Sequence, residues 1–180
     1  MARRVVNDGH GLEHALARTA QDRGISLRQL NLTREEIDRA ISDYRELFQP
    51  QQLLMLERQR RLALEAMRNL AAFAPRLAGT LVHGDGPLDR IRLLVYADSA
   101  EQVLLHLHDQ GIPWQDAEVE LRHAGNRRRS WPAARFMAGD TRVELVVLDP
   151  RSQSDPPRDS IDGGRLRTLD PSQLSALLGD

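Results

Sequence analysis

The segment LAGTLVHGDGPLDRIRLLVYAD, Leu77–Asp98, has the outline of a site that handles phosphate groups. It combines a turn of small residues, Gly79-Thr80, with a glycine-rich loop and a strand that carries Arg90 and Arg92. Glycine lets the backbone approach a phosphate group closely, and residues two apart on a strand point to the same face of a sheet. The segment therefore predicts a ligand-binding surface formed by Gly79, Thr80 and the two arginines.

Arg90 and Arg92 could bind an anion directly, because two guanidinium groups on one face can donate several hydrogen bonds to a phosphate. They could equally form the polar face of a half-solvated strand, since such alternation is common. The sequence is compatible with both interpretations. All 25 basic residues are arginine, which excludes lysine-dependent mechanisms and leaves guanidinium groups or backbone amides for any phosphate contact.

His83 lies in the glycine-rich loop beside Asp85 and is the histidine best placed for acid–base chemistry or ligand contact. The alternative is a loop histidine in water, because no residue at a suitable spacing would serve as its partner. His106 and His108 are two residues apart on an expected helix, so they do not share a face and make a poor metal pair. The sequence contains no nucleophile-elbow, P-loop or zinc-ligand motif.

Composition limits the classes of function. The formal net charge is -1, so a nucleic acid or an anionic membrane would have to be bound by a local patch. The run Arg127–Arg129 could form such a patch, or it could be the solvated tip of a hairpin. Aromatic residues make up only 4% of the chain, which argues against a stacking platform for single-stranded nucleic acid. Nucleic acid is therefore not the favoured partner.

The chain contains no cysteine, which excludes disulfides and thiolate metal sites and is compatible with a reducing compartment. The N-terminal residues lack the apolar core of a secretory signal, and no stretch approaches the roughly 20 apolar residues of a membrane-spanning helix. We therefore expect a cytoplasmic protein without a membrane partner.

The elements that must position these residues fall into a helical front and a strand-rich back. Apolar residues at helical spacing predict helices at 11–23 and 33–48, and a third helix that begins at Pro50 and ends between Phe73 and Pro75. The inner stripe of the third helix is Leu53, Leu56, Leu64, Met67 and Leu70. Its arginines, left for solvent or a partner, are Arg58, Arg60, Arg61 and Arg68.

After Pro75 the apolar period changes from helical to two. Residues 79–83 are expected to form a short strand or a turn entering one, and residues 83–89 a loop. Further strands are expected at 90–97, 117–123, 133–138 and 141–148, and helices at 99–111 and 171–178. The predicted class is α+β, with a helical region at 1–74, a mixed sheet with flanking helices at 75–150, and an irregular tail with a short helix at 151–180.

This order of elements resembles the nucleotidyltransferase fold, the palm-like domain of DNA polymerase beta and the minimal nucleotidyltransferases. More closely, the chain is similar to a group of uncharacterised bacterial proteins with a helical front, a degenerate nucleotidyltransferase domain and an SIDG-type tail. The resemblance spans about residues 75–169. It rests on the segments APRLAGTLVHG, RIRLLVYADSAEQVLLHLHDQGIPW, GDTRVELVVLDP and SIDGGRLRTL.

The resemblance implies roles for particular residues. In the family, a Gly-Gly or Gly-Ser pair approaches the triphosphate, and two carboxylates at positions i and i+2 of one strand hold two Mg²⁺ ions. A third carboxylate on a neighbouring strand helps to position the metal that activates the attacking hydroxyl group. The glycine pair maps to Gly79 and Thr80, a conservative change because threonine keeps a hydroxyl group.

The carboxylate positions depart from the family pattern. The paired carboxylates map to Arg90 and Arg92, which would repel Mg²⁺, and a slip of one residue would restore only Asp89. The third position maps to Glu144, which could remain as a metal ligand or could pair with an arginine on the next strand. Asp89 and Glu144 are thus the catalytic candidates, and no complete metal site is expected.

Three functions are compatible with these residues. The first, which we favour, is a nucleotidyltransferase-like protein that lacks two-metal catalysis and binds a nucleotide or other phosphorylated molecule in a regulatory role. The second is an active metal-dependent transferase that uses Asp85, Asp89 and Glu144, and Mg²⁺ is an expected cofactor only in that case. The third is an interaction module, in which the arginine-rich helix and the other N-terminal helices bind a partner protein or another copy of the chain.

Overall fold

The computed structural model describes residues 21, 36, 38–40, 43, 50–159 and 163–179. The helices expected at 11–23 and 33–48 fall almost entirely outside these residues, as does part of the SIDGG segment. No helix among the described residues is long and apolar enough to cross a membrane.

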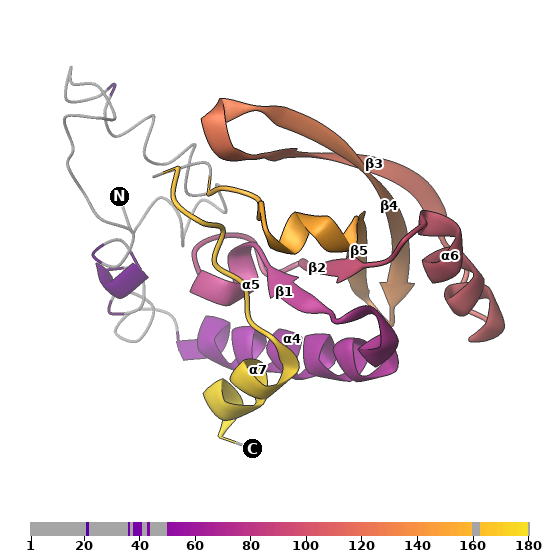
Figure 1. Cartoon of the computed structure of the whole chain (residues 1–180). Coiled ribbons are helices and arrows are strands. Elements are labelled where there is room, and N and C mark those ends of the chain that lie inside the picture. Colours follow the sequence, from indigo (N-terminus) through magenta and orange to yellow (C-terminus); the bar gives the residue numbers. More distant parts are fainter. Residues whose placement is uncertain are drawn as a thin grey trace.

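The centre of the fold is a mixed sheet of five strands in the order β1-β2-β5-β4-β3 (Figure 1). β2 and β5 run parallel to each other, and every other neighbouring pair is antiparallel. The strands are β1 Arg76–Ala78, β2 Arg90–Tyr96, β3 Gln115–Arg122, β4 Arg128–Ala138 and β5 Thr141–Leu148. The predicted α+β class, with a mixed sheet and flanking helices, is confirmed.

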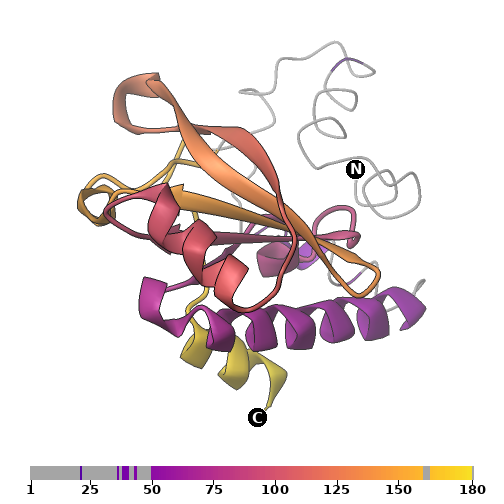
Figure 2. The ribbon, with the colours of Figure 1, turned by 90° about the vertical axis from the view of Figure 1, so that its right-hand side faces the viewer.

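Helices cover one face of this sheet. α4 lies along it with α7 beside α4, and α6 packs near β4 (Figures 1 and 2). The helices are α4 Pro50–Asn69, α5 Thr80–His83, α6 Ala100–Asp109 and α7 Pro171–Leu178. Short 3-10 turns occur at η2 Ala71–Phe73, η3 Ala124–Asn126 and η4 Pro150–Gln153. The apolar side chains between the helices and the sheet form the larger core cluster.

α4 contributes to this cluster because its apolar residues recur at helical spacing. Four members of the predicted inner stripe are buried, namely Leu56, Leu64, Met67 and Leu70. The helix ends at Asn69, earlier than expected, because η2 and the left-handed Ala74, with φ 46°, turn the chain ahead of Pro75. The division at residue 74 stays a prediction, and α4 packs into the same cluster as β2 and β5.

Residues 79–83, expected to form a short strand or a turn entering one, contain the single helical turn α5, and the strand β1 precedes it. Gly79 makes this change of direction, since its φ of 79° and ψ of -151° belong to a region that is open almost only to glycine. Arg60 on α4 fixes the turn by donating hydrogen bonds to the carbonyl oxygens of Leu81 and Val82, at 2.8 and 3.2 Å. Arg60 is therefore not left for a partner, contrary to expectation.

β4 begins at Arg128, five residues before the strand expected at 133–138. Its early part pairs only with β3, whereas Ala133–Ala138 pair with both β3 and β5 or with β5 alone. Pro132 lies where pairing with β5 stops, and a proline fits there because it has no N–H group to donate to a second neighbour. Pro132 therefore marks the point where β4 no longer pairs with β5, and it does not mark the start of β4.

The other face of the sheet is divided into an apolar half and a polar half. The apolar half is the smaller core cluster, and Leu166 from the C-terminal region packs against it. We call residues 153–159 and 163–169 the strap, because they contact both edge strands. The N–H of Arg158 donates to the carbonyl of Arg122 on β3 at 2.7 Å, and Leu169 exchanges two backbone hydrogen bonds with Leu77 on β1.

Candidate functional site

The polar half of the sheet is built around three side chains on its central strands. Strand register places Arg92 of β2 and Arg135 of β4 directly beside Glu144 of β5. Arg92 Nε donates to Glu144 Oε2 at 2.6 Å, while Arg135 donates from Nε and Nη2 to Glu144 Oε1 at 3.1 and 3.0 Å. Both oxygens of one carboxylate are thus engaged by guanidinium groups.

Glu144 is only 2% exposed, so its charge depends on these partners. Burial raises its pKa, but the charges of Arg92 and Arg90 and the hydrogen bonds from Arg92 and Arg135 outweigh burial. The pKa of Glu144 therefore lies below its ordinary value of 4.5, and the side chain is a carboxylate at neutral pH. The expectation that Glu144 pairs with an arginine on a neighbouring strand is confirmed, with two arginines instead of one.

Two more arginines continue this polar half. Arg90 of β2 lies opposite Arg142 of β5 in the next row of the sheet, on the same face as Arg92 and Glu144. Both side chains are exposed, and neither has a hydrogen bond or ion pair within the described part of the chain. The polar half therefore carries four guanidinium groups around one carboxylate, and we call these five residues the arginine face.

A cavity of about 780 Å³ opens onto the arginine face. Arg90, Arg135, Arg142 and Glu144 line it, together with Gln115 at the start of β3 and Trp114 just before that strand. Its size is within the range of small-molecule sites. The excess of positive charge favours an anionic occupant, and Trp114 offers an aromatic surface beside that charge.

Gly79 and Thr80 lie next to this face. A Cβ atom added to Gly79 would be 3.9 Å from Arg92 Cβ, so the glycine turn borders Arg92. The hydroxyl group of Thr80 donates to the carbonyl of Pro87 at 2.9 Å, which closes the loop that follows α5. The side chain of Thr80 therefore stabilises the loop that follows α5.

His83 is not a loop histidine in water, because its side chain is only 4% exposed. Its Nδ1 lies 2.7 Å from Asp38 Oδ2, and Arg167 approaches the same carboxylate oxygen at 3.9 Å. The partner was missed in the sequence because Asp38 is 45 residues away. His83 does not line the cavity at the arginine face.

The carboxylates do not fit a two-metal site. Asp89 is exposed just before β2, and Asp85 is buried in the preceding loop. Glu144 is already bound by the guanidinium groups of Arg92 and Arg135. Among the residues that the structure describes, no group of three or more histidines and carboxylates could hold a metal ion.

The run Arg127–Arg129 makes contacts within the hairpin of β3 and β4. Arg127 forms an ion pair with Asp155 at 3.0 Å, and Arg128 forms one with Glu120 at 2.9 Å. The guanidinium carbon of Arg129 lies 3.9 Å from the centre of the Trp131 ring. These contacts favour the structural interpretation of the run over a nucleic-acid patch.

Arg135 and Arg142 are the site residues that sequence reasoning missed. Arg142 and Glu144 are two apart in TRVEL, so the alternation already places them on one face. Arg135 could be found only through the register of β4 on β5, which the sequence does not reveal. The site is known from geometry alone, because no family model matches the sequence and no curated protein matches it significantly.

Proposed function

We propose that the chain binds a nucleotide or another phosphorylated small molecule on the arginine face, without two-metal catalysis, and that this binding has a regulatory role. The observation that carries the proposal is the pair Arg90 and Arg142, two exposed arginines at paired positions of β2 and β5 with no hydrogen bond or ion pair among the described residues. Like charges placed opposite each other in a sheet destabilise it, so such a pair is best explained by an anion that binds between them.

The resemblance to nucleotidyltransferases supports the same ligand class. Gly79 precedes the short helix α5, and Arg92 lies beside Glu144 on adjacent strands, where the family would have carboxylates on adjacent strands. Replacing the paired carboxylates by arginines removes the need for a cation, because a guanidinium group can bind phosphate oxygens directly. A site that would hold a metal-nucleotide complex thereby becomes one that favours the metal-free nucleotide.

The test is a thermal-shift titration of the full chain with ATP, GTP, CTP and UTP, each with EDTA and with Mg²⁺. A ligand at about 100 times its Kd stabilises the folded state by roughly 2.7 kcal/mol. We expect at least one nucleotide to stabilise the protein in EDTA, and Mg²⁺ to weaken this effect because it neutralises phosphate charge. A shift that requires Mg²⁺ would favour the active transferase, and no shift with any nucleotide would contradict the proposal.

Variants then locate the binding site. The double variant Arg90→Gln with Arg142→Gln should lose the shift, because it removes the two unpaired guanidinium groups. The matched control is Arg58→Gln with Arg68→Gln, which removes the same charge from exposed positions on α4. Equal loss in both double variants would indicate a general charge effect and would contradict a specific site on the sheet.

A further inference from the structure

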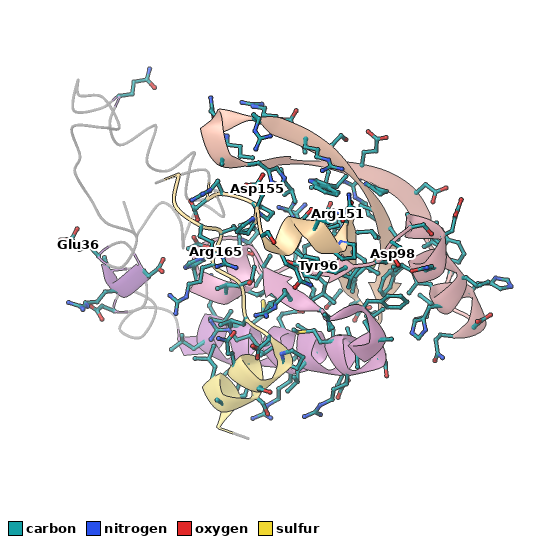
Figure 3. All side chains as sticks on the ribbon, in the orientation of Figure 1. Glu36, Tyr96, Asp98, Arg151, Asp155 and Arg165 are labelled. Atoms are coloured by element: carbon teal, nitrogen blue, oxygen red, sulfur yellow. The ribbon has the colours of Figure 1, made fainter. Side chains whose placement is uncertain are left out.

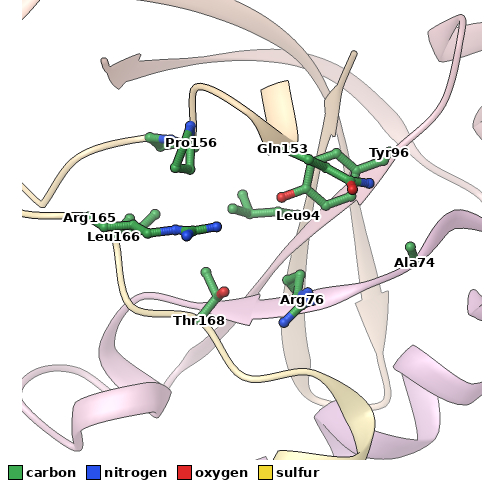
Figure 4. A pocket seen from close by; sticks show the side chains of 10 residues that line it. Ala74, Arg76, Leu94, Tyr96, Gln153, Pro156, Arg165, Leu166 and Thr168 are labelled. Carbon is green, nitrogen blue, oxygen red and sulfur yellow. The ribbon is translucent and has the colours of Figure 1, made fainter. Parts of the chain in front are cut away.

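A second cavity lies under the strap, at the other end of the same sheet face. Its volume is about 250 Å³, and its walls come from η2, β1, β2, η4 and the strap (Figure 4). The polar side chains in its lining are Arg76, Tyr96, Gln153, Arg165 and Thr168. None of these residues lines the cavity at the arginine face, so the two sites share no side chain.

Two of the polar groups in this lining make no hydrogen bond or ion pair within the part of the chain that the structure describes. Neither the Arg165 guanidinium group nor the Tyr96 hydroxyl group has a hydrogen bond or ion pair within the described residues. Figure 4 shows the Arg165 side chain reaching across the cavity toward Leu94 and Tyr96, while Figure 3 places Arg165 on the strap and Tyr96 on the sheet. Donors from two separate segments therefore converge on one space.

Arg76 provides a second positive charge from the opposite wall. Its Nη1 lies 3.4 Å from Asp170 Oδ2, and the other oxygen of Asp170 accepts a hydrogen bond from the N–H of Gln173 at the start of α7. Asp170 is thus shared between the helix cap and Arg76 and offsets one of the two positive charges. The charge of Arg165 has no counterion in the described structure.

The hydroxyl group of Tyr96 is protonated and can act as a hydrogen-bond donor in this cavity. Partial burial raises the pKa of Tyr96 above its ordinary value of 10.0, while the positive charges of Arg76 and Arg165 act in the opposite direction. The hydroxyl group is therefore neutral at physiological pH and can donate a hydrogen bond to an anion.

Backbone hydrogen bonds fix the walls of the cavity. The N–H of Leu166 donates to the carbonyl of Pro157 at 2.9 Å, which joins the two parts of the strap. The N–H of Asp159 donates to the carbonyl of Gly164 at 2.8 Å, and the pairing of Leu169 with Leu77 fixes the far end. The cavity is therefore formed before any ligand arrives, which lowers the entropic cost of binding.

We infer that this cavity is a second binding site, for a small molecule that carries a phosphate or carboxylate group on a compact apolar body. Arg165 and Arg76 would bind the anionic group, and Tyr96 would donate a hydrogen bond to it. The apolar part would contact Leu94 and Leu166. The volume is below that of sites for drug-sized ligands, which limits the occupant to a small molecule. This inference does not depend on nucleotide binding at the arginine face.

The test uses four probes on the full chain, with binding followed by backbone amide NMR shifts. Phenyl phosphate and benzoate carry an anionic group on a ring, inorganic phosphate lacks the ring, and benzyl alcohol lacks the charge. We expect saturable shifts in the strap and β2 with phenyl phosphate or benzoate, and the stronger of the two identifies the preferred anion. Absence of saturable shifts with both, or equal binding of benzyl alcohol, would overturn the inference.

Variants separate this site from the arginine face. Arg165→Gln should weaken probe binding about tenfold, as expected for the loss of a charged hydrogen bond, and Tyr96→Phe should weaken it about threefold while keeping the ring. The exposed control Arg68→Gln and the double variant Arg90→Gln with Arg142→Gln should bind the probe as the wild type does. Loss of binding in that double variant but not in Arg165→Gln would overturn the inference.

Discussion

Glu144 shows how one side chain can have two opposite interpretations. The resemblance to nucleotidyltransferases implies a metal ligand at this position, whereas in the structure the carboxylate is bound by two guanidinium groups. A buried carboxylate must have partners, and the structure provides Arg92 and Arg135 through three hydrogen bonds. The two interpretations predict opposite results when its charge is removed.

Glu144→Gln should strengthen nucleotide binding. The substitution keeps the shape of the side chain but removes the negative charge beside the anion, so the Kd for the nucleotide should fall by about threefold to tenfold. A titration in EDTA would measure this change. If Glu144 were a metal ligand for catalysis, the same variant would instead lose a Mg²⁺-dependent turnover that the wild type possesses.

The same variant should lose stability in a pH-dependent way. The pKa of Glu144 is lowered in the folded state, so its contribution is complete above about pH 4.5 and disappears as the pH falls through the folded-state pKa. Glu144→Gln should therefore cost about 2 kcal/mol at pH 7 and progressively less below pH 4, as urea unfolding would measure. Glu120→Gln, which breaks the exposed pair with Arg128, should cost less than about 0.5 kcal/mol.

Part of the candidate site could be identified from the sequence. Arg90, Arg92, Glu144 and Gly79 could be identified because each belongs to a local pattern on a predictable strand or turn. Arg135 could not be identified, because its position beside Glu144 depends on the register between β4 and β5. The sequence does not show where the hairpin between these two strands begins and ends. Asp38 as the partner of His83 was equally inaccessible, because that contact depends on how distant segments pack.

At the scale of elements, the turn between β1 and α5 depends on a backbone conformation and not on packing. Gly79 has open space around an added Cβ atom, with the nearest atom at an ordinary contact distance of 3.9 Å. Its φ and ψ, however, lie outside the left-handed region that other residues can occupy. The sequence predicted a short strand or a turn entering one here, because residues 79–83 alone do not reveal that reversal.

Gly79→Ala should therefore cost about 2 to 3 kcal/mol, because alanine cannot adopt this conformation without strain. The control is Gly139→Ala, because the φ of 60° at Gly139 lies in the left-handed region and no atom lies within 4 Å of a Cβ added there. That variant should cost about 1 kcal/mol. Unfolding free energies from urea titration test the difference, and equal losses would show that the conformation of Gly79 is not decisive.

Most elements could be predicted from the sequence. The period of apolar residues located β2, β5, α4 and α7 to within a few residues, because these elements each have a clearly buried face. The prediction of strand bounds failed where another feature outweighed the apolar period. At Pro132, for example, β4 continues as a strand although it pairs only with β3. The order of strands could not be predicted, since β2 pairs with β5 across about 50 intervening residues.

At the scale of the whole molecule, α4 packs into the same apolar core as the strands of the sheet. Leu56, Leu64 and Met67 of α4 and Leu70 just after it are buried with the sheet, and full burial of each contributes about 2 kcal/mol, or roughly 8 kcal/mol together. That sum is comparable to the total stability of a typical domain. A chain starting at residue 50 should therefore fold, whereas one starting at residue 75 should not.

Circular dichroism and urea unfolding of residues 50–180 and 75–180 would test this. We expect cooperative unfolding for the longer chain and none for the shorter one. A cooperative transition in residues 75–180 would show instead that the sheet is stable without α4 and would support a domain boundary near residue 74.

The strap also covers backbone groups on both edges of the sheet. A free edge strand invites addition of a strand from a second molecule, and β1 and β3 are the two edges here. The hydrogen bonds from Leu169 to Leu77 and from Arg158 to Arg122 occupy backbone groups on both edges. Proteolytic removal of the C-terminal residues would therefore expose backbone groups on both edge strands at once. Further molecules could then add to either edge, and the protein would aggregate.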